Sequence, residues 1–293
     1  MAERKRKKDD HENQRDLKVS AAKLLKSLHC GNGPGAAEVR PEAEQSPYFK
    51  QDQQHRVGED FFNQTCINLA KALLGKVLVR RYTDGTELRG KIVETEAYLG
   101  GEDRASHSAG GKRTERNTAM FMKPGTIYVY PIYGIYLCMN VSSQGEGAAV
   151  LLRSLEPLQG QPLMRQLRAA RRRDGARQLK DKELCNGPSK LCQALSIPRC
   201  FDRRDLASDP EVWLERDPRA PPPESLDVVS ASRIGIESHG EWATKPLRFY
   251  LRGHPCVSVV NKEAERQVPS GTVTHDLGAS DVQSDTGQQD VIT

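Results

Sequence analysis

Regularly spaced apolar side chains begin near Tyr48 and end near residue 262 of the 293-residue chain. The first strong pattern covers residues 59–74, where apolar residues recur at helical spacing and Gly75 follows. This pattern predicts an amphipathic helix that ends at the glycine. We therefore expect a folded region at residues 48–262, with a disordered tail at 1–47 and a polar, disordered tail at 263–293.

A β-hairpin is predicted directly after this helix. Residues 76–82 and 87–98 have the composition of strands, and Asp84-Gly85 between them is a typical hairpin turn. The remaining apolar runs predict further strands at 148–155, 212–214, 226–236 and 256–260, and further helices at 161–173 and 190–195.

The end of the predicted strand 87–98 is unusually acidic. Side chains alternate between the two faces of a strand, so Glu94, Glu96 and Tyr98 share one face. Two carboxylates and a phenol on one face are out of place in a hydrophobic core. Either they belong to a functional site, or this face of the sheet is simply solvated.

Four of the eight tyrosines fall in the nine-residue run 128–136. The alternation before Pro131 and the apolar residues after Gly134 predict two strands joined by a turn. Tyr133 then lies at or near the tip of a hairpin. It is a candidate wedge that enters between stacked bases. The alternative is that these tyrosines are ordinary strand residues that pack against a sheet.

Three charged or titratable positions draw attention. Arg153 interrupts the apolar run at 148–155, and it should be paired or functional because an unpaired buried charge is costly. His107 lies in a polar loop, where a lone histidine is usually just exposed. Lys190 follows Gly187-Pro188-Ser189 at a helix start, which is either an anion site or a simple Pro/Ser start.

Composition narrows the class of protein. An apolar fraction of 37% is low for a chain that is folded throughout, and no apolar run is long enough to span a membrane. The chain begins with charged residues and shows no secretory signal. The net charge of +5 is compatible with a polyanionic partner. The basic block Arg4–Lys8 is either a nuclear-localisation signal or a solvated tail.

The seven cysteines do not suggest a disulfide framework or a metal site. Their number is odd, no CxxC pair occurs, and the gaps between Cys185, Cys192 and Cys200 fit no common zinc pattern. We expect reduced thiols in an intracellular protein, with no metal and no organic cofactor.

Several segments together resemble one known family. Residues 92–98, His107, residues 120–126, the tyrosine hairpin and residues 187–191 occur in the order found in the alkyladenine (3-methyladenine) DNA glycosylases of vertebrates. The resemblance covers roughly 48–260. It implies an α+β fold, a single compact domain around a curved antiparallel sheet with a protruding β-hairpin and no helix-hairpin-helix.

The resemblance also implies a reaction. The expected activity is monofunctional hydrolysis of the N-glycosidic bond of damaged purines such as 3-methyladenine, 7-methylguanine, hypoxanthine and ethenoadenine in duplex DNA. Glu96 matches the general base that activates water, and Arg153 with the backbone around Ile234 matches the groups that hold this water. Tyr133 matches the side chain that fills the gap left by the flipped nucleotide. Glu94 is the obvious rival to Glu96, and only the resemblance distinguishes them.

The remaining implied roles concern the base and the DNA backbone. Tyr98 and His107 match one wall of a base pocket, Tyr130 matches the opposite wall, and Asn140 matches the residue that crowds the amino group of guanine. Flipping costs a few kcal/mol, and cationic alkylated purines prefer aromatic faces. Weak, salt-sensitive backbone binding is expected from Lys112, Arg113, Arg116 and Lys190.

The sequence departs from the family pattern at three positions. Pro131 and Ile135 replace an expected non-proline apolar residue and a methionine, and Ala109 lacks an expected basic character. These changes bear on hairpin shape and DNA affinity. We expect a monomeric nuclear repair enzyme, with a non-catalytic reader of damaged bases and an RNA-binding module as alternatives.

Overall fold

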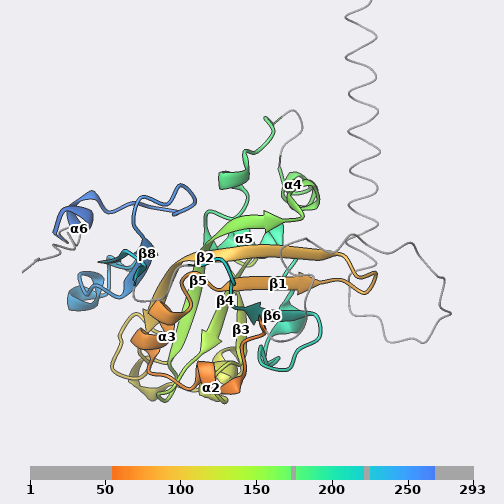
Figure 1. Cartoon of the computed structure of the whole chain (residues 1–293). Helices are drawn as coiled ribbons and strands as arrows, with labels where there is room; N and C mark the ends of the chain where they lie inside the picture. The colour runs from red at the N-terminus through yellow and green to blue at the C-terminus, as the bar shows by residue number, and fades with distance from the viewer. Residues whose placement is uncertain (1–54, 173–175, 221–224, 268–293) are drawn as a thin grey trace, which may run out of the picture.

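The computed structural model describes residues 55–172, 176–220 and 225–267 (Figure 1). The basic block at Arg4–Lys8, the expected start of the fold at Tyr48 and nearly all of both expected tails lie outside these described residues. Within the three ranges, no helix combines the length and apolar character needed to cross a bilayer.

An eight-stranded antiparallel sheet forms the centre of the molecule, which confirms the expected fold class. Six strands follow one another in the order β3-β4-β5-β2-β1-β6, while β8 pairs with β2 and β7 pairs with β8. The strands are β1 (Val77–Arg81), β2 (Glu87–Tyr98), β3 (Ile127–Ile132), β4 (Tyr136–Ser142), β5 (Ala149–Gln159), β6 (Val212–Glu215), β7 (Val228–Ala231) and β8 (Arg248–Leu251).

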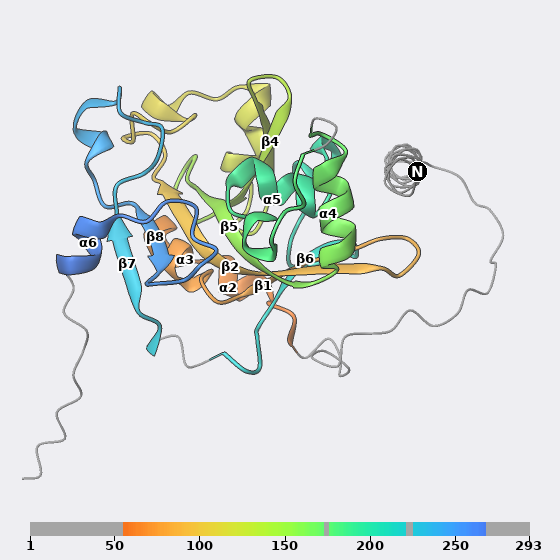
Figure 2. The ribbon, with the colours of Figure 1, turned by 90° about the horizontal axis from the view of Figure 1, so that it is seen from above.

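Strand β2 is the strand at which the sheet divides. One of its edges pairs with β5 over most of its length, and its other edge pairs first with β1 and then, at Glu94–Glu96, with β8 (Figure 2). The acidic end of β2 therefore lies between two neighbouring strands. This position explains why these polar residues are buried, although a sequence pattern alone also fits an exposed face.

Short helices cover the sheet. Figure 1 shows α4 (Gln161–Ala169) and α5 (Pro188–Ala194) above it and α2 (Glu59–Phe62) and α3 (Cys66–Ala72) below it. Apolar side chains from these helices and from both faces of the strands form one main core. A small helix, α6 (Lys262–Gln267), closes the described chain.

The predicted helix at 59–74 is in fact two helices. The chain leaves helical geometry at Asn63 and is extended at Thr65, the N-cap of α3. Here Gln64 donates a side-chain hydrogen bond to the carbonyl of Phe61, and Thr65 bridges to Gln144. Polar side chains of this kind compete with helical hydrogen bonds, which the apolar spacing does not reveal.

Three predictions for the C-terminal third need correction. The strand expected at 226–236 is limited to β7, and β8 was not predicted. Residues 256–260 form turns in place of a strand, because their backbone groups bond buried side chains. Residues 263–267 of the expected tail belong to helix α6.

Candidate active site

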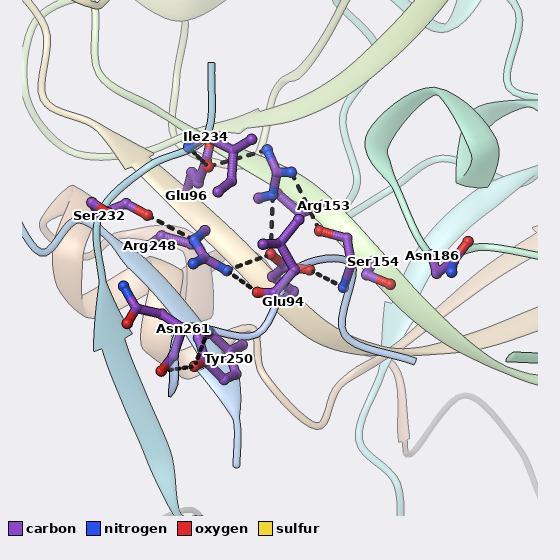
Figure 3. Close-up of polar contacts among 12 residues, drawn as sticks. Glu94, Glu96, Arg153, Ser154, Asn186, Ser232, Ile234, Arg248, Tyr250 and Asn261 are labelled. Atoms are coloured by element: carbon purple, nitrogen blue, oxygen red, sulfur yellow. Dashed lines mark hydrogen bonds and ion pairs between the residues drawn. The ribbon is translucent and has the colours of Figure 1, made fainter. Parts of the chain in front are cut away.

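Glu96 lies at the centre of a buried polar cluster near the end of β2 (Figure 3). Its Oε1 atom accepts a hydrogen bond from the backbone N–H of Ile234 at 2.8 Å and lies 3.1 Å from Nη1 of Arg153. Its Oε2 atom accepts a hydrogen bond from the hydroxyl of Tyr98 at 2.9 Å. Three of the residues predicted from the sequence thus converge on this carboxylate, which has no exposed surface.

Arg153 reaches Glu96 because the ladder between β2 and β5 is irregular. The register shifts between Ile92 and Glu94 and again between Glu94 and Thr95, where Ser154 and Leu152 are the paired partners. Arg153 is left out of the regular pairing. Irregularities of this kind re-aim side chains, and this one directs an arginine between two glutamates.

Glu94 is buried as completely as Glu96 but has different neighbours. Its Oε1 atom accepts hydrogen bonds from Nε of Arg153 at 3.1 Å and from Nη1 of Arg248 at 2.9 Å. Its Oε2 atom accepts one from the backbone N–H of Ser258 at 2.7 Å. The solvated-face interpretation of the two glutamates is therefore wrong, since neither side chain is exposed.

Electrostatics fix the protonation of the groups around Glu96. Burial alone would lower the pKa of Arg153, but the charges on Glu96 and Glu94 outweigh it and raise this pKa. Burial, followed by the charge on Glu96, raises the pKa of Tyr98 well above 10. Tyr98 is therefore a neutral phenol that donates its proton to the carboxylate, and Arg153 is a cation.

Aromatic rings lie next to this cluster. Tyr128 and Tyr130 stack with ring centroids 5.2 Å apart, and His107 meets Tyr130 edge-on at 4.6 Å. The Nδ1 atom of His107 is 2.9 Å from the hydroxyl of Tyr128. Partial burial, assisted by the positive charge of Arg116, lowers the pKa of His107 to about 4. His107 is exposed to solvent, yet it contacts both Tyr128 and Tyr130.

Two of the rings predicted to enclose a base, those of His107 and Tyr130, contact each other and leave no space between them. Because His107 and Tyr130 are in direct contact, a base can lie between them only after they separate. Burial raises the pKa of Tyr130, to which Cys138 and the charge on Glu96 also contribute. Tyr130 packs against a small apolar group that contains Ala149, the β5 partner of Tyr98.

The tyrosine hairpin contains both a packed strand residue and a protruding one. Tyr128 is buried, as an ordinary strand residue would be, whereas Tyr133 is 86% exposed at the tip. Tyr133 and Gly134 have φ values of 50° and 72°, the left-handed conformation, in the loop 133–135 that joins Ile132 to Tyr136. Pro131, expected to bracket the turn, instead lies within β3.

Asn140 lies on β4, directly opposite Tyr128 of β3 and Leu151 of β5. It is buried, and its Nδ2 atom donates a hydrogen bond to the carbonyl of Tyr128 at 3.1 Å. This bond ties the amide to β3, the strand that carries Tyr128 and Tyr130.

The predicted backbone-binding residues form two groups. Lys112, Arg113 and Arg116 are exposed in the segment before β3, and Arg116 lies over the ring of Tyr130 at 5.1 Å. Arg113 forms an ion pair with Glu146. Lys190 is separate from them on α5, where its Nζ atom donates to Oδ1 of Asn186 at 3.0 Å.

Several residues of the cluster were not recognised in the sequence. They are Arg248, Ser258, Arg233 and Asp103. Arg248 carries the signal that identified Arg153, an arginine within an apolar run, and it could have been found in this way. Ser258 bonds Glu94 through its backbone N–H, and its hydroxyl accepts a bond from Nη2 of Arg153 at 3.3 Å; a single serine in a loop leaves no distinctive sequence signal. No group of histidine, cysteine, aspartate and glutamate side chains in the described ranges has the arrangement of a metal site.

Comparison with known proteins agrees with this architecture. The family model for methylpurine-DNA glycosylase matches residues 60–255. The chain is 62% identical over 224 residues to DNA-3-methyladenine glycosylase of Homo sapiens, covering 75% of this chain and 74% of that protein. The corresponding enzyme of Mus musculus is 60% identical over 229 residues, covering 77% and 68%.

A more distant relative is found in bacteria. A putative 3-methyladenine DNA glycosylase of Clostridium perfringens is 43% identical over 205 residues, which cover 69% of this chain and 98% of that protein.

The protein is therefore an enzyme of the DNA glycosylase class, which hydrolyses N-glycosidic bonds in DNA during base excision repair. Within that class, the chain belongs to the methylpurine-DNA glycosylase family.

Proposed function

We propose that this protein flips 3-methyladenine, 7-methylguanine, hypoxanthine and ethenoadenine out of duplex DNA and hydrolyses their glycosidic bond with a water activated by Glu96. The product is an abasic site in an otherwise intact strand. The observation that supports this role for Glu96 is its donor set, which comprises one cation, one phenol and one backbone N–H. Such a set holds the carboxylate in one orientation before the substrate arrives.

The difference between the two glutamates supports the choice of base. Glu94 accepts bonds from two guanidinium groups and one N–H, so both of its carboxylate oxygens have charged or polar partners within the protein. Within the described residues, Glu96 accepts a bond from only one guanidinium group, and its Oε2 atom is bonded by the neutral phenol of Tyr98. A carboxylate at this position suits both deprotonation of water and the oxocarbenium-like sugar that develops during bond breaking.

The aromatic group supports recognition of the base. The faces of Tyr98 and Tyr130 suit the stacking of a purine, and a cationic alkylated purine gains about 0.5–2 kcal/mol more from such faces. Because the pKa of His107 is about 4, this ring is neutral at physiological pH and does not repel a cation. Asn140, tied to the strand that carries Tyr130, limits the space for an additional amino group.

The exposed Tyr133 supports base flipping. It lies on the same hairpin as the pocket residue Tyr130, at the tip where its ring is free to enter a base stack. Lys112, Arg113, Arg116 and Lys190 provide the exposed positive charge for the DNA backbone. We further propose that the protein acts as a monomer in the nucleus, to which the basic block at Arg4–Lys8 directs it.

The decisive experiment measures excision from a duplex with a single hypoxanthine, in which hot alkali converts abasic sites to strand breaks. In Glu96→Gln, we expect the single-turnover rate to fall about 10²–10⁴-fold, the contribution typical of a general base. Binding of the damaged duplex should remain, because the neutral amide keeps the size of the side chain.

Glu87→Gln is the matched control, since it changes a glutamate at the opposite end of the same strand. It should excise hypoxanthine at the wild-type rate. Wild-type activity in Glu96→Gln, or a wild-type protein that binds the duplex without producing breaks, would contradict the proposal.

A further inference from the structure

Glu96 belongs to a charge-balanced set of four buried side chains. Glu94 and Glu96 contribute two negative charges, Arg153 and Arg248 two positive ones, and none of the four side chains is more than 8% exposed. Arg153 contacts both carboxylates, whereas Arg248 contacts Glu94. Glu94 is therefore the link between the two arginines (Figure 3).

The contact with Glu94 determines how Arg153 is oriented. A guanidinium is planar, so two bonds from the same group define its plane. Nε of Arg153 is bonded to Glu94 at 3.1 Å, while Nη1 lies at the same distance from Glu96. A third, longer contact runs from Nη2 to Oγ of Ser258 at 3.3 Å. Without Glu94, one of the two carboxylate anchors is lost and the flexible side chain gains alternative rotamers.

Arg248 contacts the backbone near a second donor of Glu96, the N–H of Ile234. Its Nε atom donates to the carbonyl of Ser232 at 2.7 Å, and its Nη1 atom donates to the carbonyl of Val259 at 2.7 Å as well as to Glu94. Ser232 lies two residues before Ile234, whose N–H is bonded to Glu96. Arg248 thus ties Glu94 to the backbone segment that carries this N–H.

We propose that Glu94 and Arg248 are positioning residues for the glycosylase reaction. Glu94 orients Arg153, and Arg248 both neutralises Glu94 and holds the segment at 232–234, so that two donors are aimed at Glu96 before the substrate binds. This inference rests on the proposed role of Glu96. It assigns to Glu94 an essential part in the reaction that is different from that of the base.

The test compares single-turnover excision of hypoxanthine with affinity for the same duplex, using the full chain. In Glu94→Gln and Arg248→Met, we expect the rate to fall about 10- to 100-fold, the loss that a misplaced catalytic group produces. Affinity should stay within about threefold, because neither residue is expected to touch DNA. Arg248→Lys, which restores the charge, should recover most of the rate.

Glu215→Gln provides a control for simple loss of stability. Glu215 is also buried, pairs with Arg89 and accepts a bond from Trp213, but it lies on β6. Thermal unfolding of every variant gives the folded fraction by which its rate is corrected. We expect Glu215→Gln to lose stability and to keep its corrected rate.

The inference is wrong if the corrected rate of Glu94→Gln equals that of wild type, or if its loss appears in affinity alone. It is also wrong if Arg248→Lys and Arg248→Met are equally impaired. Glu96→Gln, measured in parallel, separates the two proposals. If Glu96→Gln is inactive and Glu94→Gln is not impaired, the role of Glu96 stands and the positioning role fails. If Glu96→Gln is fully active, the basis of both is removed.

Discussion

At the scale of single residues, the site depends on groups whose protonation is set by their surroundings. Burial and the adjacent charge of Glu96 keep Tyr98 protonated, so that it serves as a donor to a carboxylate. His107 is shifted in the direction that burial imposes on a base, and Arg116 adds to this shift. Both rings are consequently neutral, which under the proposed function suits neutral and cationic purines alike.

The low pKa of His107 leads to a direct prediction. Its imidazole should remain neutral from about pH 8 to about pH 5, and NMR titration of the histidine side chains should give this residue a midpoint near 4. Arg116→Gln should raise the midpoint, because it removes a nearby positive charge. A midpoint near the ordinary value of 6.5 in the wild-type protein would contradict the prediction.

This shift also sets the sign of a contribution to stability. The unfolded chain binds a proton at this histidine near pH 6.5, whereas the folded chain binds it only near pH 4. In this interval the unfolded state binds more protons, so the stability due to this residue is complete above pH 6.5 and decreases as the pH falls towards 4. Histidine-to-glutamine substitution at position 107 should remove this part of the pH dependence of urea unfolding.

At the scale of elements, the β3–β4 hairpin accepts local strain at its tip. Tyr133 is a large residue in the left-handed conformation, which asparagine or glycine adopts more readily. Arg171, which follows α4, supports the turn by donating to the carbonyl of Ile135 at 3.0 Å. A ring at this position does not stabilise the fold through packing, since it is 86% exposed.

Tyr133→Asn should therefore affect stability and activity in opposite directions. We expect the free energy of unfolding to rise by about 0.5–1 kcal/mol, part of the roughly 1–2 kcal/mol that this conformation costs. Excision of hypoxanthine should weaken about tenfold to a hundredfold, as is typical when a ring that stacks on a base is lost. Tyr133→Phe is the control, and it should resemble wild type in both urea unfolding and excision. Wild-type excision by Tyr133→Asn would exclude the wedge.

At the scale of the whole molecule, a buried ion pair joins the loop of His107 to the backbone segment of Ile234. Arg233 and Asp103 have no exposed side-chain surface, and Nη2 of Arg233 donates to Oδ1 of Asp103 at 2.8 Å. Asp103 also accepts a bond from the N–H of Leu99, and the guanidinium lies 4.5 Å from the ring of Tyr98. The pair thus holds together chain segments that are distant in sequence.

Breaking this pair should cost far more stability than breaking an exposed one. Asp103→Asn leaves an uncompensated buried arginine and should lower the free energy of unfolding by about 3–5 kcal/mol in urea titrations. Asp227→Asn removes the partly exposed pair with Arg252 and should cost about 0–1 kcal/mol. Equal losses in the two variants would show that the buried pair has no special structural role.

The main polar residues of the site can be identified from short stretches of the sequence. The period of two along β2 places Glu94, Glu96 and Tyr98 on one face whatever surrounds the strand, and a charge within an apolar run marks Arg153. The alternation before Pro131 and the apolar residues after Gly134 predict a hairpin with Tyr133 at or near its tip. These features depend on neighbours a few residues away, so they survive without knowledge of the fold.

The different surroundings of Glu94 and Glu96 come from the tertiary structure. Two adjacent, equally buried carboxylates differ because Arg248 and Ser258 reach one of them and the N–H of Ile234 reaches the other. Those partners arrive through the pairing of β2 with β8 and through turns near the chain end, neither of which local periodicity encodes. Burial and charge pairing depend on the whole packed chain, which is why the different donor sets of the two glutamates are not visible in the local sequence.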